Sequence, residues 1–346
     1  MQGLSVAAAT AGGAELAWAT VLGESIADIA WLPSGKLLLA GTADGELCAF
    51  QLDAEWKFRV QAHRQGITRI SPSPAGDTIA TTGEDGALLL WRADTGEPLE
   101  TLGLDHNWAE HLAWSADGRT LAGVAGSRLY VRDADGNTSE WDGHPGNLAA
   151  LAWAPKGRRL ASAANKGVYL WNLGSWQPTR VLNFPGAAVS LAWSHDGHAL
   201  AAGTQDGFLH IRLQLSGATP RQLSMSGYPG KVSALSWHPK QLRIASCGGS
   251  DLVLWDLDAK QGTRRATPLR RHSHTLTALA YAPNGVWLAS ADRNGRLCIW
   301  SADHLVAFEM ELGSEITALA WQPGGHGLAV GSVDGVVRLF NLGDGR

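Results

Sequence analysis

Apolar and polar positions repeat along this chain, and one pattern of about twenty-five residues occurs eight times. Its clearest copies span residues 26–50, 148–171, 276–300 and 316–340, and the other four begin at Ile67, Ala109, Ala188 and Val232. Successive copies start 39 to 44 residues apart. Within each copy, short runs of alternating apolar and polar residues are separated by Gly, Pro and Asp, which predicts strands joined by tight turns.

The copy that begins at Ile67 shows the elements of one unit. Its predicted strands are Ile67–Ile70, Thr78–Gly83, Ala87–Trp91 and, with a looser pattern suited to an outer edge, Pro98–Gly103. Pro74 and Gly76 form the first turn, and Asp85-Gly86 predicts a hairpin, because such a turn requires the positive φ that glycine accepts. A four-stranded antiparallel sheet of this kind exposes two apolar faces and needs neighbours on both sides.

A period in the low forties with four antiparallel strands per unit predicts an all-β, eight-bladed β-propeller. The repeats fill positions 26 to 340, so we expect a single domain over residues 1–346. The last copy ends near the C-terminus without an outer strand, and Glu15–Leu22 has a strand pattern but no other partner. We therefore expect this segment to close the last blade. The repeat cores are 26–50, 67–91, 109–132, 148–171, 188–212, 232–255, 276–300 and 316–340.

The order of motifs within each copy resembles that of the WD-repeat propellers. A Leu-Ala-Trp-like first strand, a Pro-x-Gly turn, a Leu-Ala-Ser-like second strand, an Asp-Gly turn and a third strand ending in Trp recur over nearly the whole chain. The resemblance implies a structural set in which a His before the first strand, a Ser or Thr, an Asp and the Trp are hydrogen-bonded. His63, Asp85 and Trp91, with Thr81 or Thr82, match this set best.

Other copies match the structural set only in part. His144, Ser162 and Trp171 match with Lys166 at the Asp position, and His272, Ser290 and Trp300 match with Asn294 there. Leu22, Phe184, Tyr228 and Leu312 occupy the His position, and Arg132 and Arg212 occupy the Trp position. These departures put the hydrogen bonding of single blades in question and leave the predicted fold unchanged.

Most copies also carry an aromatic residue at the end of the first strand. These residues are Trp31, Trp114, Trp153, Trp193, Trp237, Trp321 and Tyr281. Because large aromatic side chains bury much surface, we interpret them as packing between neighbouring blades.

Composition and charge exclude some classes of protein. Hydrophobic residues make up 45% of the chain and charged residues 17%, as is typical of a soluble globular protein. The net charge of −4 disfavours a nucleic-acid binder, which usually has a basic excess. No apolar run reaches the roughly 18 residues of a membrane span, and the first residues lack the charge of a signal peptide. Cys48, Cys247 and Cys298 lie in strand patterns, which predicts buried reduced thiols and a cytoplasmic protein.

The sequence contains no motif that favours catalysis. Walker loops, Gly-x-Ser-x-Gly elbows, Cys-x-x-Cys pairs and His-Glu-x-x-His pairs are absent. Asp44, Asp85, Asp206 and Asp334 recur at one repeat position, and we interpret them as turn residues. Among the histidines, only His195 and His198 have plausible ligand spacing, and they lie in an ordinary turn. We therefore expect no enzyme, no cofactor and no metal.

Candidate partner-binding residues lie in the loops at one end of the blades, before the first strands or before the Asp-Gly turns. Loops on a rigid scaffold commonly carry function, and Arg and aromatic residues are enriched in interface hot spots. The candidates are Arg64, Glu84, Trp108, Phe184, Tyr228, Lys231, His274 and Arg293. Phe184 and Tyr228 have an alternative role, which is to fill the space of the missing His. Trp108 is the strongest outlier, because a large apolar ring is unusual in a loop, and it is either a contact residue or a packing residue.

The resemblance implies a non-enzymatic scaffold or adaptor that binds another protein or a peptide through the propeller faces, as a monomer or as a subunit of a larger complex. The alternative is a small-ligand or metal-handling accessory protein that uses the central channel or the His-bearing loops. Residues 240–271 contain seven basic residues, including Arg264, Arg265, Arg270 and Arg271, and three acidic ones. A solvated edge is the simpler interpretation of that stretch, and a docking surface for an acidic partner is the alternative.

Overall fold

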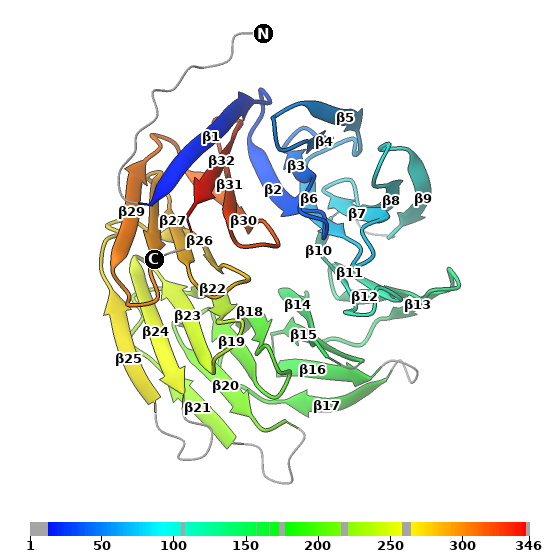
Figure 1. Ribbon diagram of the computed structural model, residues 1–346. Coiled ribbons are helices and arrows are strands. Elements are labelled where there is room, and N and C mark those ends of the chain that lie inside the picture. The colour runs from blue at the N-terminus through cyan, green and yellow to red at the C-terminus, as the bar shows by residue number, and fades with distance from the viewer. Residues whose placement is uncertain are drawn as a thin grey trace. The chain divides into compact units, whose positions relative to one another are not determined.

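The structure, a computed structural model, describes residues 13–104, 108–156, 158–165, 167–172, 177–215, 221–257 and 264–343 (Figure 1). These residues form eight sheets of four antiparallel strands. The sheets are the blades of an all-β, eight-bladed β-propeller, which confirms the fold predicted from the repeat. The chain divides into two compact units, with boundaries at residues 109/110 and 279/280.

The first unit contains blades 1, 2 and 8 and most of blade 7. Blade 1 consists of β2 (Ile26–Trp31), β3 (Leu38–Thr42), β4 (Glu46–Phe50) and β5 (Trp56–Gln61), and blade 2 of β6 (Ile67–Pro72), β7 (Thr78–Gly83), β8 (Ala87–Arg92) and β9 (Pro98–Gly103). Blade 7 consists of β26 (Leu276–Tyr281), β27 (Leu288–Asp292), β28 (Arg296–Trp300) and β29 (Val306–Glu311), and blade 8 of β30 (Ile316–Trp321), β31 (Gly327–Ser332), β32 (Val336–Leu342) and β1 (Ala14–Val21).

The second unit contains blades 3 to 6. Blade 3 consists of β10 (Ala109–Trp114), β11 (Leu121–Ala125), β12 (Arg128–Arg132) and β13 (Thr138–Trp141), and blade 4 of β14 (Ala150–Trp153), β15 (Arg159–Ala164), β16 (Gly167–Asn172) and β17 (Pro178–Leu182). Blade 5 consists of β18 (Ala188–Trp193), β19 (Leu200–Thr204), β20 (Leu209–Leu213) and β21 (Arg221–Met225), and blade 6 of β22 (Val232–Trp237), β23 (Arg243–Gly248), β24 (Asp251–Leu257) and β25 (Arg264–Leu269).

Strand β1 is the outer strand of blade 8, which confirms the predicted role of the N-terminal segment (Figure 1). It begins and ends one residue earlier than expected, and it pairs with β32 through seven residue pairs. Trp18 extends this contact to blade 1, because its indole donates a hydrogen bond to the carbonyl oxygen of Leu52 at 2.9 Å. Its ring also lies 5.8 Å from that of Phe50. The start of the chain therefore joins blade 8 to blade 1.

The second strands of the blades form the core. In blades 1, 3, 5, 7 and 8, every residue of the second strand is buried, since both faces of the sheet are covered. The third strand shows the alternation that a half-covered strand requires: in β8, buried Leu88 and Leu90 alternate with partly exposed Ala87 and Leu89. The polar loops at the strand ends are thus held on a closely packed scaffold.

Tryptophans at the ends of first strands connect neighbouring blades, and for five of them this confirms the predicted packing. Each indole nitrogen donates to the carbonyl oxygen of the Ala that precedes the aromatic residue of the preceding blade. In the first unit, Trp31 donates to Ala320 at 3.1 Å and Trp321 to Ala280 at 2.9 Å. In the second unit, Trp153 donates to Ala113 at 2.9 Å, and Trp193 to Ala152 and Trp237 to Ala192 at 3.0 Å.

Removing one of these indole donors should weaken the contact between two blades. We expect Trp193→Phe to lower the free energy of unfolding by about 1 kcal/mol or more, because the substitution leaves the Ala152 carbonyl without its donor. Chemical denaturation measures this difference. Trp56→Phe is the matched control, since the Trp56 ring is 41% exposed. An equal loss of stability in both variants would contradict a specific role for the indole hydrogen bond.

The three cysteines are free and buried, as predicted. Burial raises the pKa of the Cys48 thiol to about 12 and that of Cys247 to about 11. Both thiols are therefore protonated and poorly nucleophilic near neutral pH. In the part of the chain that the structure describes, no helix is long and apolar enough to cross a membrane.

Candidate interaction surface

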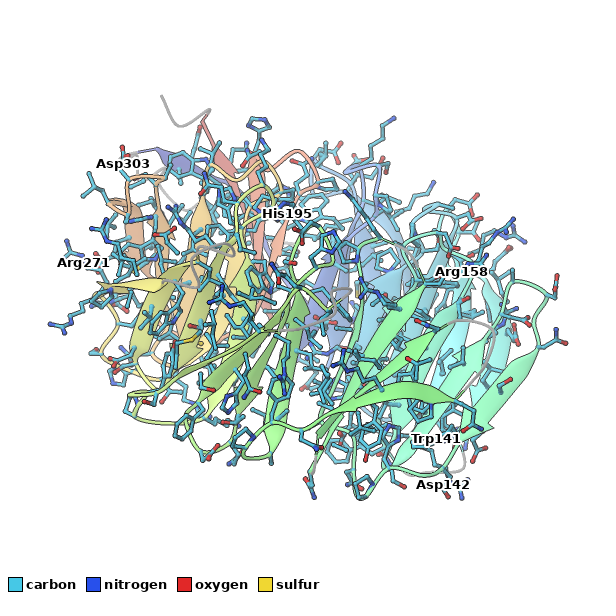
Figure 2. The ribbon with its side chains drawn as sticks, turned by 90° about the horizontal axis from the view of Figure 1, so that it is seen from below. Trp141, Asp142, Arg158, His195, Arg271 and Asp303 are labelled. Atoms are coloured by element: carbon cyan, nitrogen blue, oxygen red, sulfur yellow. The ribbon has the colours of Figure 1, made fainter. Side chains whose placement is uncertain are left out.

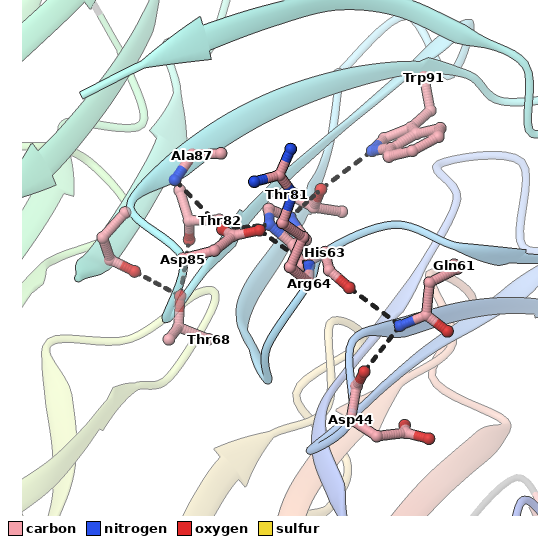
Figure 3. Close-up of polar contacts among 11 residues, drawn as sticks. Asp44, Gln61, His63, Arg64, Thr68, Thr81, Thr82, Asp85, Ala87 and Trp91 are labelled. Carbon is pink, nitrogen blue, oxygen red and sulfur yellow. Dashed lines mark hydrogen bonds and ion pairs between the residues drawn. The ribbon is translucent and has the colours of Figure 1, made fainter. Parts of the chain in front are cut away.

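The structural set predicted in blade 2 is present and complete (Figure 3). His63 Nδ1 lies 2.8 Å from Asp85 Oδ1, and His63 Nε2 lies 2.8 Å from Thr81 Oγ1. Trp91 Nε1 donates to Thr81 Oγ1 at 2.9 Å. Thr81 is therefore the hydroxyl member of the set. Thr82, the other candidate, contacts Thr68 instead, at 3.0 Å.

The protonation of His63 follows from its partners. Burial lowers the pKa of His63, against the opposing effect of Asp85. Burial would raise the pKa of Asp85, but hydrogen bonds from the Arg64 backbone N–H and from His63 hold it below its usual value. A neutral His63 that is protonated at Nδ1 satisfies every group, because it donates to Asp85 and accepts from Thr81. The set therefore fixes the loop before β6 to the turn before β8.

Blade 4 keeps the same set without an acidic residue. His144 Nε2 lies 3.0 Å from Ser162 Oγ, which also accepts a hydrogen bond from Trp171 Nε1 at 2.9 Å. His144 Nδ1 donates to the carbonyl oxygen of Ser127 at 3.1 Å. A backbone carbonyl thus replaces the missing Asp. Lys166, which stands at the Asp position, lies outside the described residues.

Blade 7 keeps the hydrogen bond of the set from Trp300 Nε1 to Ser290 Oγ, at 2.9 Å. The residue that caps its turn is Asp292, which was not predicted. Its Oδ1 accepts from the backbone N–H groups of Asn294 at 2.9 Å and Arg296 at 3.1 Å. Asn294, predicted to replace the turn aspartate, is one of the residues that Asp292 holds.

Blades 1, 5 and 8 lack the His and stabilise their turns with a hydroxyl. Thr42, Thr204 and Ser332 each donate to the aspartate two residues later, Asp44, Asp206 and Asp334, at 2.5 Å. The role of these three hydroxyl residues was not predicted from the sequence. Their signal was present, since each stands two positions before an Asp-Gly pair.

Tyr228 of blade 6 takes over the role of the His with a hydroxyl group. Its OH lies 2.5 Å from Ser246 Oγ and accepts from Trp255 Nε1 at 2.8 Å. In blades 2 and 6 the ring at the His position packs against a glycine: a Cβ on Gly248 would lie 2.7 Å from Tyr228 Cβ, and one on Gly83 only 2.4 Å from His63 Nδ1. Tyr228 is therefore a member of a buried structural set.

Arg64, labelled in Figure 3, precedes β6 of blade 2, and Glu84 lies in the turn between β7 and β8 of the same blade. Arg64 is exposed, and its backbone N–H donates to Asp85 Oδ2 at 2.9 Å. Glu84 is half-buried in the β7–β8 turn, and its backbone N–H donates to the carbonyl oxygen of Gly66 at 2.9 Å. Both side chains thus project from loops whose backbones are fixed by hydrogen bonds.

Trp108 is a large apolar residue in the loop that precedes β10. Half of its surface, 50%, is exposed. The next residue, Ala109, is fully buried, and its carbonyl oxygen accepts a hydrogen bond from Thr68 Oγ1 in blade 2. An exposed aromatic ring beside an anchored backbone is available for contact. We call Arg64, Glu84 and Trp108 the Trp108 surface.

A cavity of about 380 Å³ opens beside Arg64. Arg64 and Asp85 line it with Leu89 and Thr101, which belong to the outer part of blade 2. The cavity offers room for a partner side chain next to a charged and an apolar wall.

Phe184, unlike Trp108, is buried. Its ring is only 6% exposed and packs 5.6 Å from His210 in a stacked arrangement. The guanidinium of Arg212 lies 5.5 Å from its centroid on the blade 5 face. The ring therefore fills the space of the missing His, and little of it can reach a partner.

The other predicted residues are exposed. Lys231 and His274 belong to the second unit, and Arg293 to the first. Arg293 Nε lies 3.4 Å from Glu315 Oε1, in an ion pair between blades 7 and 8. Such an exposed pair contributes little to stability, so both side chains are free to exchange partners.

Among the described residues, no group of three or more His, Cys, Asp or Glu side chains could hold a metal ion. In the turn that contains His195 and His198, Asp196 accepts from the backbone N–H of His198 at 2.9 Å. Within the second unit, His195 lies at the opposite end of the strands from Trp141 and Asp142 (Figure 2). His106, another loop histidine, lies outside the described residues.

Five stretches of the chain match the family described as WD domain, G-beta repeat, at residues 55–92, 135–172, 176–211, 220–256 and 262–301. Residues 299–346 match the family described as anaphase-promoting complex subunit 4 WD40 domain. The stretches that match the first description cover more than half of the chain. The crystal structure of the computationally designed Ika8 protein is similar in fold, with a TM-score of 0.80, 21% sequence identity and coverage of 93% of this chain and 98% of that one.

The similarity to natural proteins covers only part of their lengths. The chain is 26% identical over 219 residues to a guanine nucleotide-binding protein subunit beta of Arabidopsis thaliana, which covers 59% of this chain and 58% of that protein. It is 25% identical over 338 residues to striatin-4 of Mus musculus, with 84% and 43% covered. It is 23% identical over 273 residues to a serine-threonine kinase receptor-associated protein of Gallus gallus, with 78% and 76% covered. The chain thus spans about half the length of the first two relatives.

Proposed function

Because the chain belongs to the WD40-repeat family of β-propellers, we propose that it is a non-enzymatic scaffold that binds another protein or a peptide through the Trp108 surface. The observation that carries the proposal is the exposure of the Trp108 ring, 50%, on a loop whose next residue is fully buried. A half-exposed aromatic ring in the loop before β10 and an exposed Arg in the loop before β6 match the composition of interface hot spots. The relatives' names describe a subunit and a receptor-associated protein, which supports a role in protein assemblies.

The residues around the Trp108 surface are better suited to contact with a partner than to catalysis. The aspartates nearby, Asp44 and Asp85, accept hydrogen bonds that hold their own turns. His63, which precedes Arg64, is 2% exposed and uses both ring nitrogens in the structural set. We propose that the protein acts in the cytoplasm, on the basis of its buried free cysteines.

Trp108→Ala should separate binding from folding. We expect capture of the partner from a lysate of the native cell to weaken by about 2 kcal/mol, or roughly thirtyfold in Kd, as for other interface hot spots. The melting temperature should stay within a few degrees of wild type, because the ring is half exposed. Affinity purification followed by quantitative mass spectrometry measures the first effect, and differential scanning calorimetry the second.

Trp56→Ala is the matched control for this experiment, since Trp56 is a second tryptophan with 41% of its surface exposed. A partner lost with Trp108→Ala and kept with Trp56→Ala supports the Trp108 surface. Equal capture by wild type and Trp108→Ala, or unfolding of that variant, would show that the ring is a bystander or a packing residue. Calorimetric titration with zinc and copper tests the alternative of a metal-handling protein.

A further inference from the structure

A second group of charged side chains lies in the second unit, in a groove between blades 4 and 5. The groove has a volume of about 630 Å³. Its basic lining residues are Lys156, Arg159, Arg180 and His198, and Asp196 is the one carboxylate among the described residues that line it. The charge of this groove is therefore opposite in sign to the net charge of the chain, −4.

Two of these residues are already engaged within the protein. Asp196 Oδ1 accepts from Ser194 Oγ at 2.6 Å and from the backbone N–H of His198 at 2.9 Å. Burial would raise the pKa of Asp196, but these hydrogen bonds hold it below its usual value. Arg159 donates to the carbonyl oxygen of Gly197 at 2.6 Å, and its guanidinium lies 5.0 Å over the Trp193 ring. Asp196 and Arg159 thus stabilise the β18–β19 turn.

Arg212 is not among the residues that line the groove, but it lies close enough to Arg180 for repulsion between the two guanidinium groups. Arg180 is exposed on β17, and Arg212 is half-buried on β20. Arg212 Nη2 donates to the carbonyl oxygen of Asn183 at a long 3.4 Å, and its buried Nε has no acceptor. Burial lowers the pKa of Arg212, and repulsion from Arg180 adds to this effect.

No carboxylate forms an ion pair with Arg180, Arg212 or Lys156 in the described part of the second unit. The connecting segments at 173–176 and 216–220 contain no Asp or Glu in their sequence. A half-buried cation beside a like charge is unfavourable unless an anion offsets it. An external carboxylate could pair with the exposed Arg180, because guanidinium groups form strong charge-assisted hydrogen bonds.

The rest of the lining indicates what kind of anion fits. Leu170 and Leu215 supply apolar contacts between the basic residues, and among the described residues that line the groove none is an aromatic residue on which a base could stack. Basic residues distributed over two blades suit a chain with several carboxylates better than a single small anion. These features favour a peptide over a nucleic acid.

We propose that the groove between blades 4 and 5 binds an acidic segment of a partner protein, with its carboxylates paired to Arg180 and Lys156 and its apolar side chains against Leu170 and Leu215. This binding site is separate from the Trp108 surface, which belongs to the other unit. Failure of one proposal therefore leaves the other unaffected.

The test uses the full chain and a short fluorescent peptide of alternating glutamate and leucine. Fluorescence anisotropy should show saturable binding that weakens as salt is added, since exposed charge pairs are screened. The same peptide with glutamine in place of glutamate should not bind. We expect Arg180→Glu to weaken binding about tenfold or more, because it removes one partner of a carboxylate and places a like charge beside it.

Two further measurements make the test specific. Arg180→Glu should keep or raise the melting temperature, because the new carboxylate can pair with Arg212, whereas a merely structural Arg180 would give a loss. Arg265→Glu is the matched control, an exposed Arg on β25 outside the groove, and should bind the peptide as wild type does. The proposal is overturned if wild type does not bind the peptide, if Arg180→Glu binds equally well, or if single-stranded DNA competes at equal concentration.

Discussion

Deleting residues 1–21 should destabilise the protein more than any single substitution considered for this chain. The deletion removes β1, its seven residue pairs with β32 and the contact of Trp18 with blade 1. It also exposes the edge of β32, where Leu339 is 3% exposed and Phe340 is fully buried. A bare apolar edge strand promotes aggregation. We expect a loss of about 5 kcal/mol or more, because removal of a buried large side chain alone costs about 3–5 kcal/mol.

Scanning calorimetry and size-exclusion chromatography measure the melting temperature and the aggregation of the deletion variant. Trp18→Ala should show a smaller loss of stability than the deletion, and Glu15→Ala, on the exposed face of the same strand, should be close to wild type. A synthetic peptide of residues 13–22 added to the deletion variant should restore part of the stability. A deletion variant that melts within a few degrees of wild type would show that β1 does not hold blades 8 and 1 together.

The closing strand could be predicted because the sequence of blade 8 lacks an outer strand. Blade 8 had three strands in the sequence, Glu15–Leu22 had no other partner, and a sheet edge with apolar residues needs cover. The strands of blade 2 were predicted to within two residues for the same kind of reason, since alternation and the Asp85-Gly86 turn fix the register locally. Local patterns therefore determine each blade.

The hydrogen-bonded sets could be predicted only where a His was present. The sequence could not distinguish Thr81 from Thr82, because neighbours on a strand point to opposite faces and both faces of β7 are buried. Tyr228 and Phe184 occupy the same repeat position, yet the first donates and accepts hydrogen bonds and the second only packs. That difference depends on Ser246 and Trp255, which the structure brings to Tyr228.

The exposure of loop residues was the least predictable property. Trp108 and Phe184 are both aromatic residues in loops before a first strand, but one is 50% exposed and the other 6%. The exposure of each ring depends on whether the neighbouring blade covers it. The sequence of a single repeat does not contain this information. The groove between blades 4 and 5 was missed for this reason, since Lys156 and His198, which both line it, are far apart in sequence. One signal in the sequence was Arg212, which stands near Arg180 at a position where Trp is expected.

The second large effect that we expect is a loss of stability in mild acid caused by His144. Its imidazole is 7% exposed and lies between aromatic rings, with centroids 4.2 Å from Trp141 and 4.8 Å from Tyr169. Burial lowers the pKa of His144 to about 4, while the unfolded chain takes up the proton near the ordinary value of 6.5. Between these two pH values the unfolded state binds more protons, so stability falls as the pH falls.

The expected size of this effect follows from the shift in pKa. A lowering from 6.5 to about 4 corresponds to about 3 kcal/mol, at about 1.4 kcal/mol per unit. His144→Gln cannot take up a proton at this position, so it should be less stable than wild type at neutral pH, and the difference between the two should shrink by up to about 3 kcal/mol toward pH 4. Denaturant unfolding at several pH values measures that difference. His274→Gln is the matched control, because it removes an exposed imidazole in place of a buried one. A difference between wild type and His144→Gln that does not change with pH would mean that the buried imidazole takes up its proton as readily as in the unfolded chain.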